Sequence, residues 1–72
     1  MKSKINTQFG ERIVELRKKA GISQDELAFR SGIHRAYMGT IERGEKSVTL
    51  NTIEKIANGL GVKVKALFDW ED

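Results

Sequence analysis

Short apolar stripes that each end at a glycine constrain this chain more than any other feature. In successive segments of the 72 residues, apolar side chains recur at steps of three and four, the spacing of one helix face. The stripes stop at Gly21, Gly32, Gly44 and Gly61, and glycine readily adopts the left-handed conformation that closes a helix. The chain has no proline, and we identify no strand in it. We therefore expect an all-α fold with tight connections.

Five short helices follow from this pattern, at about residues 7–20, 24–31, 35–43, 50–60 and 64–68. Ser23 with Glu26 three residues later forms a capping box for the second helix. Thr49 caps the fourth helix, with Val48 and Ile53 at the positions of a hydrophobic staple. The inward stripe of that helix is predicted to contain Leu50, Ile53, Ile56, Ala57 and Leu60.

The length allows one domain, residues 1–72, with one small core. Without cysteine the chain can form neither a disulfide nor a thiolate metal site. No apolar run approaches the length that spans a bilayer, and no signal peptide is evident, so we expect a soluble cytoplasmic protein. The net charge of +3 alone does not establish a partner. The acidic Asp69, Glu71 and Asp72 at the end should lie away from any phosphate.

Four residues set the angle between the second and third helices. Ala28 is small where two helices must approach closely, and Gly32 can adopt the positive φ that a tight turn requires. Met38 and Ile41 are apolar where the third helix packs back on the first two. Together these features predict a helix-turn-helix over about residues 23–44, a motif that places its second helix in the major groove of DNA.

This pattern resembles the Cro/repressor-type, or XRE-like, family of helix-turn-helix transcriptional regulators. The matching stretches include FGERI at 9–13, GISQDELA at 21–28 and IERG at 41–44, and the likeness spans about residues 8–68. The resemblance implies a lambda-repressor-like DNA-binding domain that binds operator DNA as a homodimer. Residues 33–44 look most like the small controller proteins of restriction–modification systems.

Base contacts are expected on the outward face of the third helix. Arg35 lies at the N-terminal end, which enters the groove, and can donate two hydrogen bonds to O6 and N7 of guanine. Thr40 offers a methyl or a hydroxyl group about one turn later, and Ala36 can touch only a thymine methyl. Tyr37 is a secondary candidate. Gly39 indicates either close approach of the backbone to DNA or a packing constraint.

Phosphate contacts are expected around both ends of the motif. Gln24 and the free N–H groups of the first turn suit a phosphate oxygen, although Asp25 and Glu26 oppose one. The resemblance gives Gln24 the role of the family's phosphate anchor. The further candidates are Ser23, Arg43, Lys46 and Ser47.

Glu42 places a carboxylate at the C-terminal end of its helix, where the helix dipole disfavours negative charge. It therefore needs a cation, and the resemblance names Arg17. We predict a partly buried Arg17–Glu42 salt bridge that ties the first helix to the third.

The apolar C-terminal cluster has two explanations. Val62 and Leu67 are best placed to close the core, but a small monomer would not comfortably hide the rest. We favour a two-fold dimer interface that draws on Val64, Leu67, Phe68 and Trp70. A dimer would place two recognition helices about 34–36 Å apart on a palindromic site.

Other functions remain as alternatives. His34 is the only histidine, so we expect no metal site, no cofactor and no enzymatic activity. No sensor domain fits, so we expect no small-molecule effector. The chain could instead be the antitoxin of a toxin–antitoxin pair that autoregulates its operon, or a protein adaptor that uses the third helix.

Overall fold

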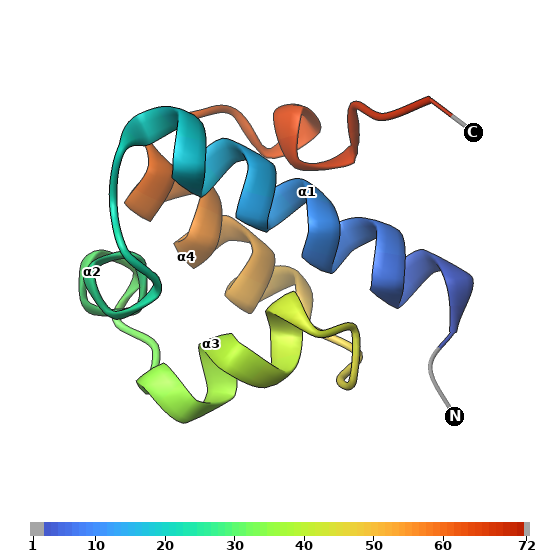
Figure 1. Ribbon diagram of the computed structural model, residues 1–72, viewed down its shortest axis with the longest axis horizontal. Helices are drawn as coiled ribbons and strands as arrows, with labels where there is room; N and C mark the ends of the chain where they lie inside the picture. The colour runs from blue at the N-terminus through green and yellow to red at the C-terminus, as the bar shows by residue number, and fades with distance from the viewer. Residues whose placement is uncertain (1–2, 72) are drawn as a thin grey trace.

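The computed structural model describes residues 3–71, and within them the chain is all-helical, as predicted. The described residues form four α-helices followed by one short 3₁₀-helix, arranged as in Figure 1. They are α1 (Lys4–Ala20), α2 (Gln24–Ser31), α3 (Arg35–Glu42), α4 (Leu50–Leu60) and η1 (Val64–Phe68). The fifth α-helix of the prediction is therefore a 3₁₀-helix. Its five residues are too few for a stable α-helix, and its N-cap, Lys63, makes no side-chain capping bond.

The helix ends follow local capping chemistry. The hydroxyl of Ser3 accepts the Asn6 N–H, so α1 begins three residues earlier than the predicted Thr7. Ser23 accepts the Glu26 N–H in the same way. The predicted capping box is only half formed, because the Glu26 carboxylate accepts a hydrogen bond from Arg30 Nε at 2.8 Å. These caps fix where each short helix starts and therefore where the connecting turns lie.

One core holds the helices together. Its buried residues come from every element: Phe9, Ile13, Leu27, Ala28, Met38, Ile41, Ile53, Ile56, Ala57 and Leu67. The prediction for Leu50 is wrong, because its side chain is 83% exposed. Leu50 is the first residue of α4, and burial begins one turn later at Ile53. Leu67 is fully buried and closes the core from η1.

The C-terminal segment is fastened to α1. Arg12 Nε donates to the carbonyl oxygen of Ala66 at 2.8 Å, and the rings of Phe9 and Phe68 lie 5.3 Å apart. Trp70 continues this stack, with its ring 5.9 Å from that of Phe68. This segment runs along the side of α1 that faces away from α3 (Figure 1).

A glycine allows α1 and α3 to pack backbone against backbone. A Cβ built on the buried Gly10 would lie 2.5 Å from the Ile41 carbonyl oxygen and 2.6 Å from that of Glu42. Both atoms are main-chain atoms at the end of α3, so they cannot turn aside as a side chain could. Gly10 therefore determines how closely the third helix lies against the first.

Replacing Gly10 with alanine should lower the free energy of unfolding by about 1–3 kcal/mol, because the new methyl group overlaps the backbone of α3. Without this contact, alanine would stabilise a helix by about 1 kcal/mol relative to glycine. Thermal or urea unfolding measures the difference. Glu11→Ala, at the exposed neighbouring position, is the control and should change stability by less than about 0.5 kcal/mol. Equal or higher stability of Gly10→Ala would contradict this packing.

Candidate nucleic-acid interface

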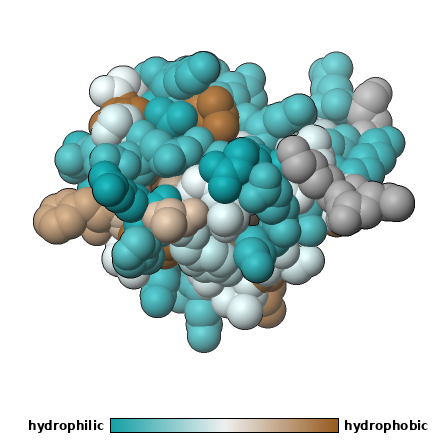
Figure 2. Space-filling view, turned by 60° about the horizontal axis from the view of Figure 1, so that its bottom comes forward, coloured by the Kyte–Doolittle hydropathy of each residue, from teal (hydrophilic) through white to brown (hydrophobic). Residues whose placement is uncertain are grey.

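The turn between α2 and α3 sets the orientation of the third helix. Gly32 adopts φ 68°, the left-handed conformation predicted for it. Nδ1 of His34 then accepts the Ala36 N–H at 3.2 Å, so this histidine caps α3. Met38 and Ile41 bury the inner face of α3, which leaves the opposite face to solvent. In Figure 2, which brings the lower side of Figure 1 forward, hydrophilic residues cover most of the face in view.

The predicted base-contacting residues differ in how they lie. Arg35 and Ala36 are exposed, whereas Tyr37 and Thr40 are half-buried. The Thr40 hydroxyl donates to the Tyr37 carbonyl oxygen at 2.7 Å, so its hydrogen is occupied within the helix. Arg35 Nη1 lies 3.5 Å from an Asp25 carboxylate oxygen, an exposed ion pair across the turn. Such pairs contribute little stability, so Arg35 can leave it at small cost.

Gly39, for which close approach to DNA and a packing constraint were both open, is buried. A Cβ at this position would meet Arg43 Nη1 at 3.1 Å and Gln24 Oε1 at 3.5 Å. Two polar side chains therefore cover the middle of α3, and the packing explanation for Gly39 is the one that the structure favours.

The predicted phosphate-contacting residues lie on both sides of α3. Ser23 and Gln24 begin α2, while Arg43, Lys46 and Ser47 follow α3. Arg43 Nε and Nη2 donate to the two Glu45 carboxylate oxygens at 3.0 and 3.2 Å. This hydrogen bonding raises the pKa of Arg43 above its ordinary value, so the group stays cationic.

Ser47 is tied to the start of the chain. Asn6 Nδ2 in α1 donates to its hydroxyl at 3.1 Å, which links the loop after α3 to the first helix. Lys46 is exposed beside it. The loop that carries these two residues is thus fastened to α1.

Glu42 joins three helices through one carboxylate. Arg17 of α1 donates to it twice, from Nε at 2.9 Å and from Nη2 at 3.2 Å. Gln24 Nε2 of α2 adds a third hydrogen bond at 3.0 Å. The Glu42 side chain is only 5% exposed and that of Arg17 14%, so the pair is largely removed from water.

This network also orients Gln24. An amide nitrogen carries two N–H donors, and the bond to Glu42 uses one of them. The Gln24 side chain is thereby held against α3 at the position from which a phosphate contact was predicted.

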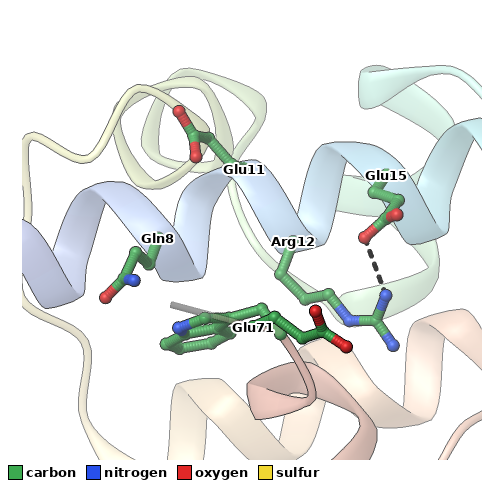
Figure 3. Close-up of a pocket in the computed structure, with 6 residues that line it drawn as sticks. Gln8, Glu11, Arg12, Glu15 and Glu71 are labelled. Atoms are coloured by element: carbon green, nitrogen blue, oxygen red, sulfur yellow. Dashed lines mark hydrogen bonds and ion pairs between the residues drawn. The ribbon is translucent and has the colours of Figure 1, made fainter.

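The C-terminal segment lies across α1 from α3 (Figure 1), and its Glu71 lines a hollow against α1; Asp72 is outside the described residues. The hollow, of about 340 Å³, lies between α1 and this segment. Figure 3 draws the residues that line it. Three carboxylates line it, from Glu11, Glu15 and Glu71, and Arg12 is already paired with Glu15 at 2.7 Å. This surface would repel phosphate.

Sequence reasoning missed several partners of the predicted residues. Arg35 pairs with Asp25, and Arg43 pairs with Glu45. The only sign of these ion pairs in the sequence was the presence of opposite charges a few to ten residues apart.

Among residues 3–71, no group of three or more metal-ligating side chains could hold an ion. No helix of the described part is long and apolar enough to cross a membrane.

Replacing Glu42 with glutamine should destabilise the fold by about 3–5 kcal/mol, because it leaves the Arg17 guanidinium in a mostly buried place without its counter-charge. Denaturant unfolding of the purified chain measures the loss. Glu54→Gln removes the same charge from an exposed position on α4 and should have little effect. Equal stability of the two variants would mean that the Arg17–Glu42 pair contributes no more than a surface contact.

Comparisons with known proteins agree with this geometry. A family model described as helix-turn-helix, HTH_3, matches residues 13–67. Control protein C.BamHI of Bacillus amyloliquefaciens is 42% identical over 71 residues, which cover 97% of this chain and 88% of that protein. Control protein C.MunI of Mycoplasma sp is 38% identical over 65 residues, which cover 89% of this chain and 88% of that protein.

Among solved structures, the restriction–modification controller protein C.AhdI of Aeromonas hydrophila superposes with a TM-score of 0.89 at 42% identity. The match covers 92% of this chain and all of the C.AhdI chain. Fold, motif and relatives lead to one assignment. The chain belongs to the helix-turn-helix family HTH_3.

Proposed function

We propose that this protein is a sequence-specific DNA-binding transcriptional regulator of the restriction–modification controller type. The observation that carries the proposal is the exposed Arg35 at the N-terminal end of α3, the end that enters the major groove in helix-turn-helix proteins. Met38 and Ile41 hold the opposite face of this helix in the core, so the arginine stands on a rigid support. The similarity to control proteins favours this role over an antitoxin or an adaptor.

In this proposal Arg35 reads a guanine, with Ala36, Tyr37 and Thr40 as further base contacts. Because Tyr37 and Thr40 are half-buried, most of the direct reading falls to Arg35. The phosphate contacts come from Ser23 and Gln24 on one side and from Lys46 and Ser47 on the other. These residues would fix the position of α3 without distinguishing base sequences.

We further propose that the protein binds a palindromic operator as a homodimer. Of the residues predicted for the interface, Val64 and Phe68 are 43% and 41% exposed and Trp70 is half-buried, so they remain candidates. Leu67 is excluded because its side chain is fully buried in the core. The exposed Leu50, which begins α4, is a second apolar candidate that the sequence reading had placed inward.

The regulator acts in the cytoplasm, where operator DNA is accessible, and its control comes from protein concentration and dimerisation. No catalytic step and no small-molecule effector form part of the proposal. Occupation of the operator is sufficient to block or to recruit polymerase.

Replacing Arg35 with alanine should relax the preference for one guanine by about 5- to 150-fold, because the bidentate contact to O6 and N7 is lost. Binding to duplexes that vary one base pair at a time measures this preference. Lys46→Ala removes an equal charge and should weaken binding to all duplexes alike. The slope of log affinity against log salt concentration should become shallower by about one. An Arg35→Ala protein with unchanged base preference would contradict the proposed role of α3.

A further inference from the structure

We propose that Arg43, expected from the sequence to contact phosphate, is a second base-reading residue. Its guanidinium lies against α3 at Gly39, where the absence of a side chain leaves room for it. The inference rests on the proposed DNA-binding function and concerns the same surface. Three observations carry it: the position of the guanidinium, the empty place beneath it and the carboxylate that holds it.

The guanidinium of Arg43 lies one turn before its own Cα. Helical side chains lean toward the N-terminus of their helix, so residue 43 extends over residue 39. The distance of 3.1 Å between Arg43 Nη1 and a Cβ built on Gly39 shows this overlap. Gly39 is buried, whereas the Arg43 side chain is 57% exposed. The arginine, and not the glycine, therefore forms the solvent-facing surface at the middle of α3.

The absence of a side chain at position 39 makes room for this arrangement. Glycine within a helix costs about 1 kcal/mol relative to alanine, so its presence needs a reason. Here a methyl group would meet the Arg43 guanidinium and the Gln24 amide, both of them ends of movable side chains. Alanine at this position would thus push the Arg43 guanidinium outward by a few tenths of an ångström without disturbing the backbone.

Glu45 holds the guanidinium while leaving part of it available. The carboxylate accepts from Nε and from one N–H of Nη2. A guanidinium has five N–H donors, so three remain, two on Nη1 and one on Nη2. One N–H of Nη1 and the remaining N–H of Nη2 point in the same direction, so together they can donate to O6 and N7 of one guanine. Glu45 therefore serves as a positioning residue that fixes the plane of the guanidinium.

The position of Arg43 differs from the position expected of a residue that contacts only phosphate. A phosphate contact needs a cation beside the groove, whereas Arg43 lies back along the face of the helix that enters it. The Arg43 guanidinium lies over Gly39, which is four residues or roughly 6 Å along α3 from Arg35. The two arginines would therefore read separate base pairs of one half-site.

The test compares the parent chain with Arg43→Ala, Gly39→Ala and the double variant on duplexes that vary one base pair at a time. Arg43→Ala should relax the preference for one guanine, different from that of Arg35, by about 5- to 150-fold. Replacing that guanine with 7-deazaguanine should reduce parent binding and leave Arg43→Ala unaffected. Gly39→Ala should relax the same preference, with a thermal unfolding midpoint that is unchanged or higher.

The double variant distinguishes the two roles of Gly39. If the glycine acts by seating Arg43, Gly39→Ala should have no further effect once Arg43 is alanine. An equal loss in both backgrounds would overturn the seating, because it would mean that DNA approaches the backbone itself. Uniform weakening of all duplexes by Arg43→Ala would overturn the base-reading role in favour of a phosphate contact.

Failure of the proposed function has a different outcome. A parent chain that prefers no duplex sequence would overturn both proposals. A parent chain that loses its preference with Arg35→Ala, but only overall affinity with Arg43→Ala, would overturn this inference alone.

Discussion

The close contact of α3 with α1 and α2 is the constraint on which the interface depends. Eight residues are too few to remain helical alone in water, so α3 is held by its neighbours. Gly10 brings the backbones of α1 and α3 together, and the Glu42 carboxylate accepts donors from Arg17 and Gln24 at the same end of α3. Contact and charge thus fix a helix whose outer face is available to a ligand.

The sequence was sufficient to predict the helical elements because the features that define them are local. Helical periodicity, caps and terminal glycines are read within a few residues, and they located all five elements. The turn at Gly32 and the Arg17–Glu42 pair were also expected, the latter from the family resemblance. Leu50 shows the limit of periodicity: a stripe gives the direction of a side chain but not whether another helix reaches it.

The remaining features depend on tertiary distances that no local pattern contains. The packing at Gly10 requires knowledge of where α3 lies relative to α1. The half-formed capping box has a local cause instead, because Arg30, four residues later on the same helix, attracts the Glu26 carboxylate. The place of Arg43 over Gly39 depends on how the helix end and Glu45 are folded. The functional surface therefore contains side chains whose roles follow from their neighbours rather than from their type.

Selection of binding sites from a pool of random duplex DNA tests the central claim most directly. The account predicts that the parent chain enriches one sequence, made of two inverted half-sites whose centres lie about one helical turn apart. Enrichment of a single half-site would contradict the homodimer. Enrichment of no sequence would contradict the claim that α3 reads DNA.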